Sequence, residues 1–195
     1  MDLKTRYLGL MLPSPVVASA GPLNAKLENL LALERHGAGA VVLPSVFEEQ
    51  IWHEQRILDQ LIDNGAESFG EALSYFPAQA AFAFDSNNHI TLIERSSRAL
   101  SIPVIASLNG TTDSGWTDYA RDFEDAGAAA IELNIYLLPT DLTLSGAEVE
   151  QRYLDVVSAV CRTVSIPVSG KVGPYFSAPG HMVRRIIDAG AKGVV

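Results

Sequence analysis

Short apolar runs rich in β-branched residues alternate along the chain with longer stretches in which apolar residues recur every three or four positions. The first pattern is typical of buried strands, and the second of helices that pack one face on a core. The clearest helix is expected over 147–163, where Val149, Tyr153, Val156 and Val160 follow that spacing. Strands are expected over 15–20, 40–45, 103–109, 130–136, 167–172 and 193–195. This alternation predicts an α/β fold with a parallel sheet.

Glycine marks the ends of the expected helices at regular intervals. Gly37, Gly127 and Gly190 each follow an amphipathic stretch, and their separations are close to multiples of ~30 residues, the length of one βα unit. The strand entry SIPV occurs at 101–104 and again 64 residues later. These marks predict a (β/α)8 TIM barrel as a single domain over 1–195. Because a complete barrel takes ~250 residues, it is expected to be truncated after about five βα units and the start of the sixth strand.

Two segments interrupt this rhythm. Residues 46–78 form an insertion that is too long for an ordinary connection, and a loop of this kind lies over the active-site face of a barrel. Its aromatic residues are expected either to pack as a lid or to bury one another. The opening GLMLPSP, at 9–15, predicts a short strand or hairpin that closes the bottom of the barrel.

Polar residues occupy alternate positions where three successive expected strands end. The pairs are Ser107 and Asn109, Glu132 and Asn134, and Ser169 and Lys171. Because side chains alternate along a strand, each pair points to one face, toward the interior of a barrel. Burying a lysine and two amides costs several kcal/mol unless each finds a partner, so the pattern indicates a polar ligand site. The alternative is a structural ion pair between Glu132 and Lys171, with Asn134 completing the network.

Composition narrows the class of protein. The 195 residues are 48% hydrophobic and 19% charged, which is ordinary for one globular domain. The net charge of −9, without a cluster of Lys or Arg, argues against partners such as nucleic acid or a membrane surface. No apolar run is long enough to cross a bilayer and the start lacks a signal peptide's apolar segment, so a cytoplasmic location is expected. The expected partner is a small-molecule substrate, and a homodimer is left open as the assembly.

The cysteine and histidine residues predict neither a disulfide nor a metal site. The single cysteine, Cys161, excludes an internal disulfide and a thiolate zinc site. It lies well along an expected helix, on the order of 22 Å from the start of that helix, and is therefore expected to be a packing residue. His36, His89 and His181 have no mutual spacing that is typical of metal ligands, so no metal site is expected.

Several segments resemble the FMN-dependent dihydroorotate dehydrogenase family, and together they extend over essentially the whole chain. The segments are GLMLPSPVVASAG, HGAGAVV, PVIASLNG, AIELNIYLLP and IPVSGKVGPY. The motif ELN, followed one strand later by the lysine of GKVGPY, is the most specific of them. The resemblance implies an oxidoreductase that oxidises dihydroorotate or a related small cyclic substrate by hydride transfer to FMN, and thus a role in pyrimidine biosynthesis.

The resemblance also implies which residues bind the cofactor. They are Ala18, Ser19, Ala20, Ser45, Asn109, Asn134 and Lys171. Asn134 would lie beside both flavin and substrate, and Lys171 would reach the N1 and O2 edge of the flavin, so these two are the expected catalytic residues. A fixed ammonium at that edge stabilises the negative charge that develops there when hydride arrives at N5.

The chain departs from the family pattern at several places. The family's catalytic base is a cysteine or serine after the ELN strand, whereas this chain continues with Tyr136 and an apolar run. Tyr136, Thr140 or Ser145 could substitute, so the base is not identified. Pro44 replaces a family lysine, and the loops that bind the FMN phosphate in the family would follow Val195. These departures leave two alternatives open: a Schiff-base aldolase or lyase that uses Lys171, and a non-catalytic barrel paralogue.

Overall fold

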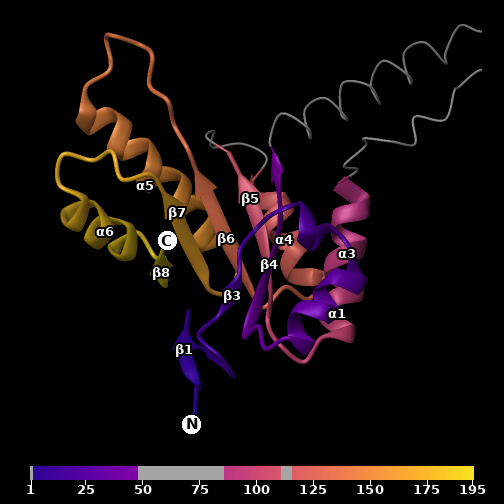
Figure 1. Ribbon diagram of the computed structural model, residues 1–195. Coiled ribbons are helices and arrows are strands. Elements are labelled where there is room, and N and C mark those ends of the chain that lie inside the picture. The colour runs from indigo at the N-terminus through magenta and orange to yellow at the C-terminus, as the bar shows by residue number, and fades with distance from the viewer. Residues whose placement is uncertain (1, 48–85, 111–115) are drawn as a thin grey trace, which may run out of the picture.

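A six-stranded parallel sheet forms the centre of the molecule (Figure 1). The computed structural model describes residues 2–47, 86–110 and 116–195. The strands lie side by side in chain order: β3 (Val17–Ala18), β4 (Ala40–Phe47), β5 (Val104–Asn109), β6 (Ala130–Ile135), β7 (Val168–Val172) and β8 (Gly193–Val194). The sheet is curled, as in half of a barrel, which confirms the α/β class and the parallel sheet. The predicted lid falls mainly within 48–85, outside the described residues.

The helices connect successive strands. They are η1 (Pro22–Ala25), α1 (Leu27–Arg35), α3 (Ser86–Ala99), α4 (Trp116–Asp125), α5 (Gly146–Thr163) and α6 (Pro179–Asp188). Helix α5 matches the predicted helix to within one residue at its start. Gly37, Gly127 and Gly190 have φ values of 92°, 95° and 120°, a region that only glycine enters without strain. They therefore end α1, α4 and α6 as the sequence predicts.

One face of the sheet, here called the outer face, is apolar along its whole length and packs against the helices. Its strands contribute Val41, Leu43, Ala106, Leu108, Ile131, Leu133 and Ile135. Ile93 of α3, Phe123 of α4 and Val157 of α5 are fully buried against this face. This continuous cluster is the main hydrophobic core of the described chain.

The opposite face, here called the inner face, is apolar only at the N-terminal ends of the strands. A hairpin of β1 (Thr5–Tyr7) and β2 (Leu10–Leu12) covers it there. Leu8 and Leu12 of the hairpin pack on residues from three strands: Ala40, Val42, Ile105 and Ala130. A Cβ atom added to Gly193 would lie 2.6 Å from Leu8 Cδ2, so β8 leaves the hairpin room by lacking a side chain. The predicted hairpin at the bottom of the sheet is confirmed.

Candidate active site

Two rows of polar side chains cross the inner face above the hairpin cluster. The register between strands aligns the lower row as Ser45, Ser107, Glu132 and Ser169, and the upper row as Asn109, Asn134 and Lys171. Partners in a parallel register point to the same face, so each row is continuous across its strands. The inner face thus changes from apolar side chains to hydroxyls and a carboxylate, and then to amides and an ammonium at the C-terminal ends of the strands.

The lower row is almost completely removed from solvent. Ser107 and Ser169 have no exposed surface and Glu132 is 4% exposed. The hydroxyl oxygens of Ser45 and Ser107 are 2.7 Å apart and share a hydrogen bond. Ser45, which the sequence assigned to a cofactor, is therefore already engaged with the neighbouring strand.

A bulge in β4 is what turns Ser45 inward. Between Val42 and Ser45, strand β4 contains one more residue than β5, and Pro44 lies within that stretch. Proline has no N–H for the ladder, and the Pro44 carbonyl accepts a hydrogen bond from the buried ring of His89. Burial lowers the pKa of His89 to about 4, against the opposing effect of that hydrogen bond. The extra residue shifts the alternation, so the inner position falls to Ser45.

Lys171 forms an ion pair with Glu132 across the two rows. Lys171 Nζ lies 3.2 Å from Glu132 Oε1, and the two side chains are 32% and 6% exposed. The structural pair considered from the sequence is therefore present. Asn134 does not complete it, because in the described part of the chain neither the Asn134 nor the Asn109 amide has a hydrogen-bond partner. Two amides and a partly exposed ammonium consequently face the space above the sheet with bonding capacity left over.

Tyr7 joins the lower row from the hairpin, a contact that the sequence did not reveal. Its phenol makes a hydrogen bond with the Ser169 hydroxyl and lies near the Glu132 carboxylate. Burial raises the pKa of Tyr7, the negative charge of Glu132 raises it further, and the bond with Ser169 opposes both. The carboxylate thus has a cation above it and neutral hydroxyl groups beside and below it.

Asn24 holds the segment after β3 in place, a role that was not predicted from the sequence. The Asn24 amide is buried and donates to the carbonyl oxygens of Ser19 at 2.9 Å and Val42 at 2.6 Å. Ala18 packs with the outer core, whereas Ala20 packs with the inner cluster and Ser19 is exposed. These three predicted cofactor-binding residues lie at the end of β3, and β4 separates them from the upper row.

The three candidates for a substitute base differ in their availability. Ser145 is the N-cap of α5, where its hydroxyl accepts a hydrogen bond from the Glu148 N–H and the Glu148 carboxylate accepts one from Ser145 N–H. Thr140 is exposed on the loop after β6. Tyr136, directly after β6, is 57% exposed. The capping role removes Ser145 from the candidates, because its oxygen already serves the helix.

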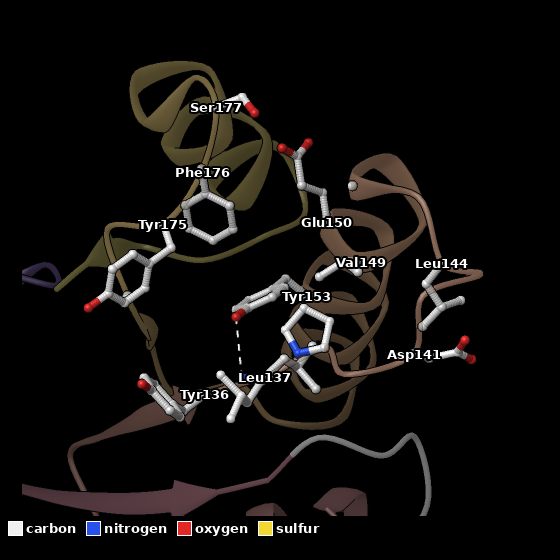
Figure 2. Close-up of a pocket in the computed structure, with 14 residues that line it drawn as sticks. Tyr136, Leu137, Asp141, Leu144, Val149, Glu150, Tyr153, Tyr175, Phe176 and Ser177 are labelled. Carbon is white, nitrogen blue, oxygen red and sulfur yellow. Dashed lines mark hydrogen bonds between the residues drawn. The ribbon is translucent and has the colours of Figure 1, made fainter.

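A cavity of about 540 Å³ opens beside the upper row, between the loops that follow β6 and β7 (Figure 2). Tyr136 and Tyr175 stand at one end of it and Asp141 and Leu144 at the other. Tyr153 of α5 lies between them, and its hydroxyl accepts a hydrogen bond of 3.3 Å from Leu137 N–H. Tyr136 and Gly173 line the cavity two residues after Asn134 and Lys171, so it adjoins the end of that row.

In the described part of the chain, the cysteine and the potential metal ligands form no further site. Cys161 packs against the outer core near the C-terminal end of α5, as predicted, and burial raises the pKa of its thiol. Among the described residues, no group of three His, Cys, Asp or Glu side chains could hold a metal ion. No described helix combines the length and the apolar character that a membrane span requires.

Two known proteins match the chain in sequence. One, from Aeropyrum pernix, carries dihydroorotate dehydrogenase A (fumarate) as a provisional name and is 28% identical over 197 residues, or 99% of this chain and 60% of that protein. The chain resembles dihydroorotate dehydrogenases. The catalytic subunit of dihydroorotate dehydrogenase B (NAD(+)) from Thermoplasma acidophilum is 27% identical over 180 residues, or 90% of this chain and 56% of that subunit. The resemblance inferred from motifs is confirmed as a distant one.

The sequence match covers only part of each relative. The chain spans 60% or less of the length of these dihydroorotate dehydrogenases, and the match extends over nearly all of this chain. No model of a protein family matches it.

Solved structures match the fold. Phosphonopyruvate hydrolase, in a complex with oxalate and Mg²⁺, superposes with a TM-score of 0.53 over 93% of this chain and 57% of its own, at 17% identity. 2,3-Dimethylmalate lyase, a member of the PEP mutase/isocitrate lyase superfamily, superposes with a TM-score of 0.51 over 92% of this chain and 55% of its own, also at 17% identity. At this identity the likeness concerns the arrangement of strands and helices alone.

Proposed function

We propose that this chain is part of an FMN-dependent oxidoreductase of the dihydroorotate dehydrogenase type, and that its six strands belong to a (β/α)8 barrel. The sequence relatives support the class of reaction and the curled parallel sheet supports the barrel. The polar rows lie toward the C-terminal ends of the strands, where barrel enzymes hold their substrates. The proposed reaction oxidises a small cyclic substrate related to dihydroorotate by transferring hydride to the flavin.

The upper row carries this proposal. Asn109, Asn134 and Lys171 are adjacent in register on three strands, and the amides of Asn109 and Asn134 have no other partner in the described chain. Amide and ammonium groups donate hydrogen bonds, which suits the N1 and O2 edge of a flavin. When bound, FMN would supply the hydride acceptor, and the Lys171 ammonium would lie where negative charge develops.

The ion pair favours this role for Lys171 over a Schiff base. An amine that attacks a carbonyl must be neutral, whereas a salt bridge with a buried carboxylate uses the charged ammonium. Glu132 cannot move away from Lys171 without leaving its own charge unpaired inside the sheet. Glu132 is therefore proposed to fix the position of the cation, and Tyr7 and Ser169 to support Glu132 from beneath.

Absorption spectroscopy of the full-length protein, purified without added cofactor, tests the proposal. The expected result is a flavin spectrum, with FMN released on denaturation and bleaching of the bound flavin by a reducing substrate. A protein that co-purifies with no flavin and binds none when FMN is added would contradict it. Borohydride treatment in the presence of a carbonyl compound is the matched control for the lyase alternative, since only a Schiff base leaves an adduct on Lys171.

A further inference from the structure

The cavity between the loops after β6 and β7 has aromatic walls and acidic polar groups. Tyr136, Tyr175 and Phe176 contribute rings from the two loops, and the buried Tyr153 lies between them. Its volume of about 540 Å³ falls in the range of small-molecule sites. Flat rings stack on tyrosine and phenylalanine side chains, so the walls suit a planar ligand.

The charge of the lining distinguishes between ligands. Asp141 and Glu150 line the cavity, and no Lys, Arg or His is among the described residues that do so. Arg185 lies 2.8 Å from Glu150, but its guanidinium is held by Glu150 and Gln151. A ligand carboxylate would therefore enter without a free cation and in the presence of the Asp141 charge.

The hydrogen-bonding groups of the lining also favour an uncharged ligand over a carboxylate. Carboxylates accept hydrogen bonds and donate none when ionised, and a tyrosine or serine hydroxyl can do either. Oδ1 of Asp141 already accepts hydrogen bonds from Thr143, and Oε2 of Glu150 accepts one from Arg185, so each carboxylate keeps one oxygen for a ligand. A ring that carries N–H groups would donate to these oxygens, whereas a carboxylate added to such a ring brings only acceptors and negative charge. The lining thus selects donors without negative charge.

We infer that this cavity binds a planar, uncharged ring bearing N–H groups, a cyclic amide and not a carboxylic acid, and that such compounds are the substrate class of this protein. The assignment of these compounds as substrates rests on the proposed function, in which Lys171 and Asn134 hold a flavin next to the cavity. The binding itself does not rest on that function, because the loops after β6 and β7 and the start of α5 form the cavity whether or not a flavin is present.

Calorimetric titration of the full-length protein with uracil and with orotate tests the inference. Orotate is uracil with one added carboxylate, so the pair isolates the effect of charge on one ring. Thymine and uracil-5-carboxylate form a second pair, in which a carboxylate replaces a methyl group on the same ring carbon. The expected result is that the uncharged member of at least one pair binds about tenfold or more tightly than its carboxylate. Equal or tighter binding of both carboxylates, or no binding of either uncharged ring, would overturn the inference.

Variants locate the binding in the cavity. Tyr175 is 86% exposed, so Tyr175→Ala removes a wall without disturbing the core, and it is expected to weaken binding of the uncharged ring about tenfold. Leu142 is fully exposed on the loop after β6 but does not line the cavity, so Leu142→Ala is the matched control. If both variants bind like the parent protein, the cavity is not the site.

The charge is tested separately. Asp141→Asn with Glu150→Gln removes both carboxylates and releases the Arg185 contact to Glu150, so orotate binding is expected to strengthen about tenfold. Uracil binding is expected to weaken, because its N–H groups lose two charged acceptors. An unchanged ratio of the two affinities would overturn the charge argument.

The two proposals fail in different ways. A colourless protein that binds uracil would overturn the proposed function and leave the cavity assignment standing, whereas a yellow protein that binds neither uncharged ring would overturn only the cavity assignment.

Discussion

The two faces of one sheet differ in what their side chains do. On the outer face the strands present apolar residues, which the helices bury completely over β4, β5 and β6 and partly at Ala18, Val172 and Val194. On the inner face the same strands present apolar residues at the bottom, hydroxyls and a carboxylate in the middle, and amides with an ammonium at the top. The outer face stabilises the fold. The inner face carries buried polar groups, and the free energy lost by removing them from water is recovered only through hydrogen bonds, ion pairs or a bound ligand.

The largest expected effect comes from the outer face. Phe123 is fully buried between α4 and the sheet, so Phe123→Ala should lower the free energy of unfolding by about 3–5 kcal/mol. Urea unfolding measures this loss. Flavin binding should persist wherever the variant is folded, and loss of the flavin from a folded variant would show that the two faces are not separable.

His89 is a polar exception on the outer side, and it should make stability depend on pH. Burial lowers its pKa to about 4, so between pH 6.5 and 4 the unfolded chain binds a proton that the folded chain does not. Stability is therefore complete above pH 6.5 and falls by roughly 3 kcal/mol as the pH drops to 4. Urea unfolding across this range should give a flatter profile for His89→Leu, while the control His36→Leu, at an exposed position, keeps the slope of the parent protein.

Removing Lys171 from the inner face should lower the free energy of unfolding by more than its own contacts contribute, because the Glu132 carboxylate loses its partner. Lys171→Ala leaves the Glu132 charge buried and unpaired, with an expected destabilisation of about 2 kcal/mol because Lys171 is itself partly exposed. Adding Glu132→Gln should recover most of this. The same cycle at Glu150 and Arg185, a half-buried pair, is the control and should give about 1 kcal/mol or less. Equal coupling energies would contradict the special burial of Glu132.

Replacing either of two glycines with alanine should change the stability of the protein, in opposite directions. Gly193→Ala would place a Cβ 2.6 Å from Leu8 Cδ2 and displace the hairpin, at about 1–2 kcal/mol. Gly180, inside α6, has no atom within 4 Å of such a Cβ, so Gly180→Ala should stabilise the protein by about 0.5–1 kcal/mol. Thermal unfolding measures both, and a neutral Gly193→Ala would mean that the hairpin is not held against β8.

Periodicity predicted the sheet and much of the inner face correctly. Asn109, Asn134 and Lys171 were placed on one face because strands alternate strictly, and the structure aligns them in register. The ends of the helices were predicted from glycine, since a left-handed residue after a helix favours it. Both signals are local, so a single sequence contains them.

The missed features depend on contacts between distant segments. Ser45 was named by the resemblance, but the bulge that turns it inward, with the Pro44 carbonyl bonded to His89, was not predicted. Tyr7 reaches Ser169, and Asn24 reaches Val42, only after the hairpin and η1 have docked on the sheet. The cavity lined by Tyr136 and Tyr175 requires two loops to meet, which no local pattern indicates.

The reduction potential of the bound flavin tests the central assignment most directly. In the full-length protein, Lys171→Ala combined with Glu132→Gln removes the cation without leaving an unpaired carboxylate. Arg184→Ala with Asp188→Asn, which removes an ion pair of α6 away from both polar rows and the cavity, is the control. The double variant at Lys171 should shift the potential to a more negative value, by about 30 mV for each tenfold loss in stabilisation of the reduced flavin, while the control leaves it unchanged. An unchanged potential in the Lys171 variant would contradict the role of this residue as the fixed cation of the site.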